Sequence, residues 1–190
     1  PRRAFMRQGA VAVVGTMLTG STYGCIRRNR YERTDLQVPI RRLPKAFQGF
    51  RIAFISDIHS SVFMTKEQMQ RYVDAVNDLH GDFIVVAGDF VNSMVDEVYP
   101  FAEAFAGLRA PHGVFGVLGN HDFYTRQVET VAGEVNKCGI TLLRSRSISI
   151  VNGESRLVLG GVDDVGSVAH AGRLFDAAFA GAEAMVPRIL

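Results

Sequence analysis

Three short apolar runs of this chain each end in a group of Asp, His or Asn residues, and this pattern strongly constrains the fold. Residues 51–56, 82–87 and 113–118 lead into Asp-Ile-His, Gly-Asp and Gly-Asn-His-Asp, respectively. Short runs rich in Val, Ile and Phe are typical of buried strands. In an open parallel sheet, ligands bind outside the carboxyl ends of the strands. If the three strands are parallel neighbours, one edge of the sheet gathers Asp57, His59, Asp89, Asn120 and His121.

The three groups carry more information together than each does alone. A single Asp after a strand usually caps a helix or forms a turn, and a single Asn-His pair usually lies in a loop. Capping does not require imidazoles in this order, however. A carbonyl oxygen can bind a divalent cation, and an imidazole can bind one or move a proton. The combined pattern therefore favours a metal site with proton-transfer chemistry.

With these motifs in this order, the chain resembles the calcineurin-like metallophosphoesterases, whose signature is D-x-H, then G-D, then G-N-H-[DE]. The resemblance covers about residues 50–164, and Gly161-Val162-Asp163-Asp164 is similar to a stretch in the exported bacterial phosphodiesterase branch. It implies an α/β fold, the four-layer α/β/β/α sandwich. Members of the family continue past a strand like 186–190 into a further His and a G-H-x-H stretch. We therefore expect the domain to be C-terminally truncated here.

The resemblance also implies roles for the site residues. Asp57 and His59 would bind a first metal, Asp89 would bridge two metals, and Asn120 would bind the second. His121 would lie off the metals and act as the general acid, while a metal-bound hydroxide attacks the phosphorus. The cofactors would be two divalent ions, and mixed Asp, His and Asn ligands suit manganese, iron or zinc. Because the C-terminal histidines are missing, we expect strong metal binding only from the full-length protein.

One departure from the family pattern bears on the substrate. In the phosphoprotein phosphatases of this family the Gly-Asp motif continues as G-D-x-x-D-R-G, whereas here it continues through Asn92-Ser93. The position that often orients the catalytic His is Asn92, and the phosphate-gripping Arg is absent. This argues against a protein phosphatase and favours phosphodiesters, nucleotides or lipid-linked phosphates. We interpret Asp163 and Asp164 as loop-capping residues and not as ligands, since Gly161 marks a turn.

The remaining periodicity predicts alternating strands and helices. Apolar residues recur at helical spacing after Thr65, after Val98 and after Thr125, and Thr65 and Thr125 are the expected caps of their helices. Residues 140–143, 147–151 and 156–159 are strand candidates, with a hairpin signal at Asn152-Gly153. A further helix is expected over 170–181. This order predicts a sheet sandwich flanked by helices.

The N-terminal part of the chain reads as an export signal and a linker. Residues 1–25 combine paired arginines, in R-R-x-F-M-R, with a mildly apolar run that resembles a twin-arginine signal. Residues 26–49 form a basic linker, and 50–190 form the metallophosphoesterase domain, incomplete at its C-terminus. We expect export to the cell envelope or periplasm, with peripheral association with the membrane or cell wall. The net charge of only +2 argues against a nucleic-acid partner.

Two function classes remain open at this point. The first is an exported metallophosphoesterase that hydrolyses phosphodiesters. Its partner would be its substrate, an envelope- or lipid-linked phosphoester. The second is a non-catalytic envelope-binding protein on the same fold. Metal ligands beyond residue 190 in the full gene would favour the enzyme, and their absence would favour the binding protein.

Overall fold

The computed structural model describes residues 31–163, 168–180 and 186–190. The predicted export signal, with Arg2 and Arg3, lies outside the described residues. The chain divides into two compact units, Pro1–Pro39 and Ile40–Leu190. The described part of the first unit, 31–39, is exposed and contains neither helix nor strand. Among the residues described, no helix combines the length and the apolar character needed to cross a membrane.

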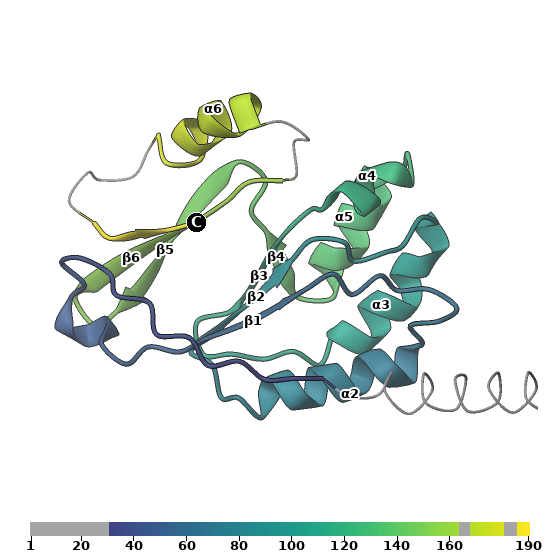
Figure 1. The fold of residues 1–190 in the computed structure, drawn as a ribbon, viewed down its shortest axis with the longest axis horizontal. Helices are drawn as coiled ribbons and strands as arrows, with labels where there is room; N and C mark the ends of the chain where they lie inside the picture. Colours follow the sequence, from purple (N-terminus) through teal and green to yellow (C-terminus); the bar gives the residue numbers. More distant parts are fainter. Residues whose placement is uncertain (1–30, 164–167, 181–185) are drawn as a thin grey trace, which may run out of the picture. The chain divides into compact units, whose positions relative to one another are not determined.

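A parallel sheet of four strands forms the base of the second unit (Figure 1). Its strands lie in chain order, β1-β2-β3-β4. They are β1 (Ile52–Ser56), β2 (Phe83–Ala87), β3 (Val114–Val117) and β4 (Ile140–Leu142). Helices separate consecutive strands, as parallel neighbours require a crossover connection. The three strands predicted before the polar motifs are therefore confirmed, and they are parallel neighbours.

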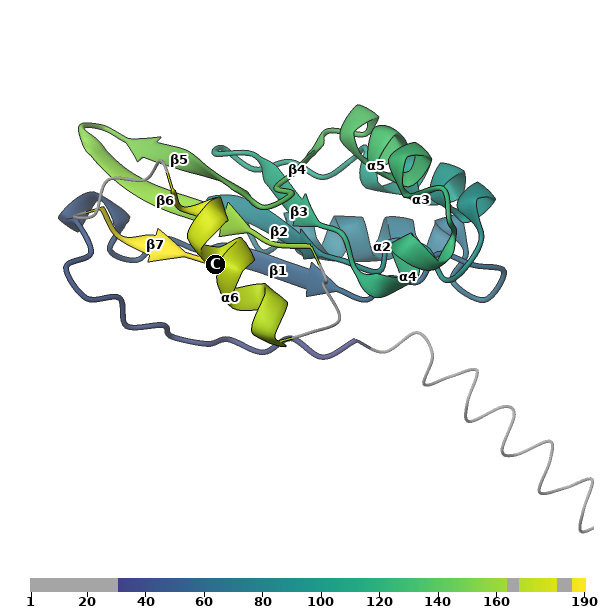
Figure 2. The ribbon, with the colours of Figure 1, turned by 90° about the horizontal axis from the view of Figure 1, so that it is seen from above.

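Three helices cover one face of this sheet, as Figures 1 and 2 show. They are α2 (Lys66–Asn77), α3 (Val98–Phe105) and α5 (Val128–Lys137). At the start of α2 the Gln68 side chain accepts a hydrogen bond from the Thr65 amide, at 3.3 Å, which confirms the predicted capping box. The predicted helical stripes pack against the sheet in one core, which includes Met69, Val73, Phe101, Phe105, Val131 and Val135.

A smaller sheet and helix α6 complete the layers. The second sheet has the order β5-β6-β7, with β5 (Arg146–Asn152) antiparallel to β6 (Ser155–Gly161) and β7 (Arg188–Ile189) parallel to β6. Leu157 and Leu159 of β6 pack with Phe83 and Phe115 of the first sheet in a second core. Helix α6 (Val168–Ala178) contacts β5 and β6. The predicted α/β/β/α order of layers is confirmed.

Two local predictions differ in detail from the structure. The hairpin between β5 and β6 forms, but Asn152 pairs with Ser155, so the turn residues are Gly153 and Glu154. Thr125 does not cap α5, which begins after Gln127. Instead it follows a short helix, α4 (Asn120–Tyr124), that periodicity did not predict. The Thr125 hydroxyl donates to the Asp122 carbonyl at 2.7 Å, a local bond that competes with capping.

The packed unit also includes residues upstream of the first strand. The short 3-10 helix η1 (Lys45–Phe47) buries Phe47 in the second core, and the Asn152 side chain donates to the Ala46 carbonyl at 2.8 Å. A second 3-10 helix, η2 (Val95–Glu97), leads into α3. These contacts tie the segment before β1 to the β5–β6 hairpin.

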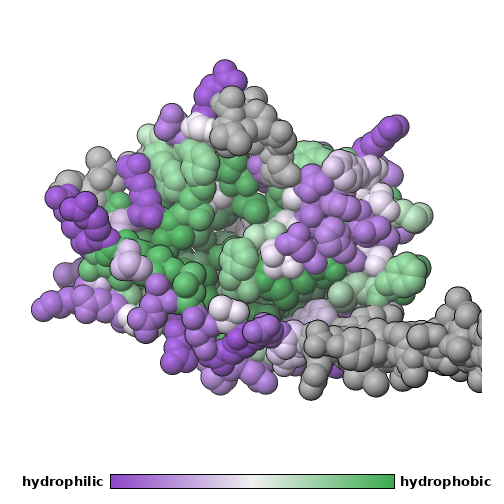
Figure 3. Space-filling view, in the orientation of Figure 1, coloured by the Kyte–Doolittle hydropathy of each residue, from purple (hydrophilic) through white to green (hydrophobic). Residues whose placement is uncertain are grey.

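The edge strand β1 keeps one of its faces open to solvent. Ala53 and Ile55 face the helices, whereas Ile52 and Phe54 alternate with them and are 40% and 64% exposed. Their partners on β2, Phe83 and Val85, belong to the second core. On the side of the molecule seen in Figure 1, the space-filling view of Figure 3 has apolar side chains gathered in the middle, between polar margins. The second sheet therefore covers the middle of the first sheet more completely than its edge.

Candidate metal centre

The ends of three parallel strands bring the polar motifs to one edge of the first sheet. Ser56 pairs with Ala87, and Ala87 pairs with Val117, so β1, β2 and β3 end at the same level. The next residues of each strand begin the three loops that carry the motifs. The convergence expected from the sequence follows directly from this register.

Backbone hydrogen bonds hold the first two loops side by side. The His59 amide donates to the Asp89 carbonyl at 2.9 Å, and the Ser60 amide donates to the Phe90 carbonyl at 3.0 Å. Asp57, His59 and Asp89 have positive φ angles of 55°, 48° and 52°, respectively. Residues other than glycine rarely adopt this left-handed conformation, and Asp, Asn and His tolerate it best. Left-handed residues in these loops turn the chain sharply just beyond the strands.

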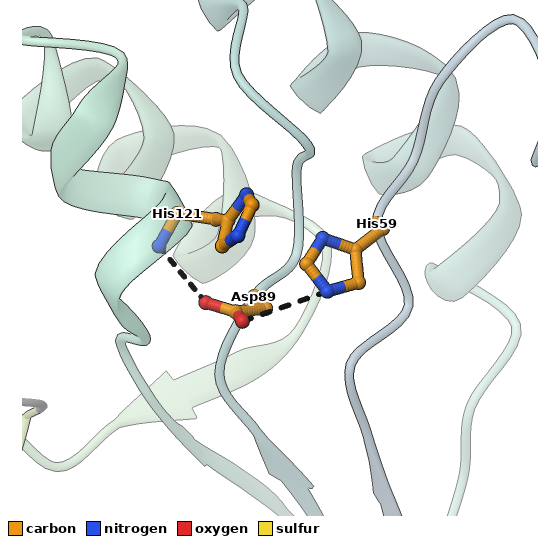
Figure 4. Close-up of side chains that lie close together, drawn as sticks. All are labelled: His59, Asp89 and His121. Carbon is orange, nitrogen blue, oxygen red and sulfur yellow. Dashed lines mark hydrogen bonds and ion pairs between the residues drawn. The ribbon is translucent and has the colours of Figure 1, made fainter.

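Two imidazoles and a carboxylate form a compact cluster at this edge (Figure 4). His59, Asp89 and His121 each offer one ligand atom, and these three atoms lie within 4.8 Å of one another. The His59 Nε2 lies 3.6 Å from Asp89 Oδ2, and the His121 amide donates to Asp89 Oδ1 at 3.0 Å. The two imidazole rings meet edge to face, with 4.4 Å between their centroids. Both oxygens of Asp89 are therefore oriented by the flanking histidines.

The donor set of this cluster fits a divalent metal ion. The buried Nδ1 of His59 has no hydrogen-bond partner among the described residues, although buried polar atoms are normally paired. Imidazole nitrogens and carboxylate oxygens together suit manganese, iron and zinc. His59 Nε2 and the Asp89 carboxylate beside it are therefore chemically suited to hold such an ion.

The other two predicted ligands occupy different surroundings. Asp57 is exposed and does not belong to the compact cluster. Asn120 begins α4, and its side-chain nitrogen donates to the Tyr124 hydroxyl at 2.8 Å. His121, expected from the resemblance to lie off the metals, groups with the two predicted ligands His59 and Asp89. The structure thus brings together three of the five predicted side chains, His59, Asp89 and His121. Asn120 directly precedes His121 in the chain, and Asp57 lies outside the cluster.

A backbone carbonyl orients the His121 ring. The Nδ1 of His121 forms a short hydrogen bond with the Asn92 carbonyl oxygen. Because a carbonyl can only accept, Nδ1 carries the hydrogen and Nε2 remains available to hold or move a proton. The Asn92 side chain donates instead to the Ser93 hydroxyl at 3.3 Å. Position 92 therefore contacts the histidine as the resemblance suggested, but through its main chain.

Asp122, the last residue of the third motif, ties two of the loops together. Its side chain is fully buried, with Oδ1 accepting from the amides of Phe90 and Val91 and Oδ2 accepting from the amide of Gly119. Burial raises the pKa of the Asp122 carboxyl to about 6, and the amide donors partly oppose this shift. The resemblance implies no role for Asp122, although its place directly after His121 is a signal that it belongs to the site.

A second aspartate joins the two sheets at the same edge. Asp163 follows β6, and its Oδ1 accepts from the Leu118 amide at 3.1 Å, just before Gly119. Its Oδ2 accepts from Arg144 Nε at 3.0 Å, and Arg144 also pairs with Glu129 of α5. The contact of Asp163 with a main-chain amide agrees with its interpretation as a loop-capping residue.

Gly88 and Gly119 allow the second and third loops to touch. A Cβ added at Gly119 would lie 2.1 Å from Asp89 Oδ1 and 2.5 Å from the Asp89 amide nitrogen. A Cβ added at Gly88, where φ is 70°, would lie 2.8 Å from the Gly119 amide nitrogen. The Asp89 carboxylate can occupy its place only because position 119 carries no side chain.

Replacing Gly119 with alanine is expected to displace Asp89. Overpacking of this kind destabilises by about 1–3 kcal/mol, and the displaced carboxylate should bind metal more weakly. Denaturant unfolding and metal titration of Gly119→Ala measure the two effects. Gly133→Ala is the matched control, because a Cβ at this α5 position meets nothing within 4 Å and helix propensity favours it by about 0.5–1 kcal/mol. Unchanged metal affinity in Gly119→Ala would contradict the packing argument.

Comparison with known proteins extends these observations. Residues 50–177 match the family described as Calcineurin-like phosphoesterase. A transmembrane protein with metallophosphoesterase domain from Danio rerio is 29% identical over 163 residues, which cover 84% of this chain and 37% of that protein. The uncharacterized metallophosphoesterase YkuE of Bacillus subtilis is 28% identical over 175 residues, covering 86% and 60%.

A third relative has a named substrate. The UDP-2,3-diacylglucosamine pyrophosphatase LpxG of Chlamydia trachomatis is 29% identical over 150 residues, covering 76% of this chain and 45% of its own length. The chain thus spans between 37% and 60% of the length of these three relatives.

Proposed function

This chain belongs to the calcineurin-like phosphoesterase family, and we propose that it carries the active site of an enzyme that hydrolyses phosphoesters with the help of divalent metals. The observation that supports this most directly is the cluster of His59, Asp89 and His121 at the carboxyl ends of the parallel strands. Ligands bind at this edge of open α/β sheets. The approach of His59 Nε2 to Asp89 Oδ2, at 3.6 Å, adds support, because imidazole nitrogens and carboxylate oxygens bind divalent metals.

We assign the metal-binding roles as the family resemblance implies. Asp57 and His59 hold one of two divalent ions, Asp89 is shared between both, and Asn120 holds the other. Two such ions, when bound, neutralise phosphate oxygens and lower the pKa of a bound water. The orientation of Asp89 by its two histidine neighbours supports a shared role, since each oxygen already faces a different side.

His121 would transfer a proton to the leaving oxygen of the substrate. The Asn92 carbonyl fixes Nδ1–H, so the proton leaves from Nε2 on the opposite side of the ring. General acid catalysis requires the acid to be held in such a defined direction. The same ring also groups with His59 and Asp89, and this proximity to two proposed metal ligands supports the role of proton donor.

The substrate we propose is a phosphodiester. Asn92-Ser93 stands where the protein phosphatases of the family carry an Asp-Arg pair, so the arginine that grips a phosphomonoester is absent. The relative LpxG is described as acting on a lipid-bearing nucleotide diphosphate, which supports an envelope- or lipid-linked phosphoester for this chain as well. Manganese is the metal we would test first.

The test is hydrolysis of a simple aryl phosphodiester by the full-length protein after removal of metals. Activity should appear on addition of Mn²⁺, and chelator should abolish it. An aryl phosphomonoester serves as the comparison substrate and should be hydrolysed more slowly. Equal activity of the metal-free and the metal-loaded protein would refute the proposed function.

We further propose that residues 1–25 direct export by the twin-arginine route, followed by the linker 26–49 and the domain 50–190. The paired arginines and the weakly apolar run support this route, which carries folded proteins. Lysine keeps the charge of arginine but not its planar guanidinium. Cell fractionation of an Arg2→Lys, Arg3→Lys double variant tests the proposal, and undiminished export would refute it.

A further inference from the structure

Tyr124 contacts both a proposed metal ligand and the proposed general acid. It ends α4, four residues after Asn120 and three after His121, and residues at these spacings share one helix face. Its hydroxyl accepts a hydrogen bond from Asn120 Nδ2 at 2.8 Å. Its ring lies 5.1 Å from the His121 ring, measured between centroids. Although 61% exposed, Tyr124 is therefore engaged on the side that faces the cluster.

The hydrogen bond holds one end of the Asn120 carboxamide and leaves the other end free. A carboxamide has an oxygen that can bind a cation and a nitrogen that cannot. When Nδ2 donates to the Tyr124 hydroxyl, Oδ1 keeps both of its lone pairs. Turned over, the carboxamide would accept from the same hydroxyl through Oδ1 and would present an NH₂ group to the cation instead. The hydroxyl thus anchors one end of the carboxamide, and a cation at the other end favours the orientation that leaves Oδ1 free.

Neighbouring contacts fix the position of that hydroxyl. The tyrosine ring packs against His121, whose own Nδ1 is held by the Asn92 carbonyl. At the end of the helix, Thr125 donates to the Asp122 carbonyl, and Asp122 is anchored by three main-chain amides. Partners that orient metal ligands in this way contribute to metal affinity without touching the metal.

We propose that Tyr124 is a positioning residue that holds the Asn120 oxygen toward the second metal. This inference rests on the proposed function, since it takes Asn120 to be a metal ligand. It adds a residue outside the three sequence motifs to the site. It also gives the exposed hydroxyl a role that depends on its partner and not on any direct contact with substrate.

The test is Mn²⁺ titration of the full-length Tyr124→Phe variant by calorimetry. This change removes the hydroxyl and keeps the ring against His121. One of two binding steps should weaken by roughly 10–100-fold, as expected for loss of a partner that orients a ligand. The other step and the thermal unfolding of the metal-free protein should be unchanged. The Mn²⁺ concentration for half-maximal activity should rise, while the rate at saturating Mn²⁺ should recover.

Tyr99→Phe is the matched control, because Tyr99 is an exposed tyrosine of α3 and should bind Mn²⁺ as the wild type does. Equal affinities of Tyr124→Phe and wild type would overturn this inference and leave the proposed function standing. A rate that stays low at saturating Mn²⁺ with unchanged affinity would also overturn it, since the hydroxyl would then act elsewhere. Failure of the wild type to bind Mn²⁺ would overturn the proposed function, and this inference with it.

Discussion

Replacing Asp89 with alanine is expected to remove both metals and to lower hydrolysis to the background rate. The carboxylate is the proposed shared ligand, and each of its oxygens lies beside a different histidine. Loss of metal removes several kcal/mol of transition-state stabilisation. About 5 kcal/mol corresponds to a fall of roughly 10³–10⁴-fold in rate. Elemental analysis and the phosphodiester assay measure the two effects on the same preparation.

A second variant separates the charge of Asp89 from its backbone conformation. Asp89 has a φ of 52°, which alanine tolerates poorly and asparagine tolerates well. Asp89→Asn should therefore keep the fold and the contact with the His121 amide while still losing metal. Asp96→Asn, at an exposed position of η2, removes an equal charge and should have no effect. Full metal content in Asp89→Asn would contradict the shared-ligand role.

Replacing His121 with alanine is expected to lower the rate by roughly 10²–10⁴-fold while metal content stays nearly intact. A general acid protonates the leaving oxygen, so the loss should be larger for a poor leaving group than for an aryl leaving group that needs little protonation. Rates with aryl and alkyl phosphodiesters, together with elemental analysis, test both statements. His80→Asn serves as the control, because His80 is exposed and asparagine tolerates the positive φ of that position.

The structure makes the His121 experiment more discriminating than the sequence alone did. His121 groups with His59 and Asp89, so it could bind metal directly. Loss of metal from His121→Ala would then be the result, and it would show that the histidine is a ligand and not the proton donor. Retained metal with an equal loss of rate for both leaving groups would also contradict the assignment.

The strands and the convergence of motifs were predictable because their causes are local and periodic. The predicted run over 82–87 matches β2 to within one residue, since five apolar residues bounded by Asp and Gly leave little choice. Parallel order then brings Ser56, Ala87 and Val117 level, and with them the loops that follow. The helices that cover the sheet followed from apolar residues at helical spacing, which Met69, Val73 and Val76 of α2 illustrate.

The contacts around the site were not predictable in the same way, because they join residues about thirty positions apart. Asp122 was not recognised as a tie between loops, since its partners are main-chain amides of Phe90 and Val91, which no sequence motif marks. For the same reason, the Asn92 carbonyl could not be identified as the partner of His121. The α4 helix is too short to show periodicity, so the sequence pattern associates Thr125 with the wrong helix and gives no signal for Tyr124.

The left-handed residues at the ends of β1 and β2 have a consequence for how this sequence tolerates change. Asp57, His59 and Asp89 occupy a conformation that glycine adopts freely and that other residues adopt at an energetic disadvantage of order 1 kcal/mol or more. A library of variants sorted only for folding should therefore enrich glycine at these three positions. The same library sorted for phosphodiester hydrolysis should retain Asp, His and Asp. Positions where the two selections disagree would mark the active site independently of any comparison with relatives.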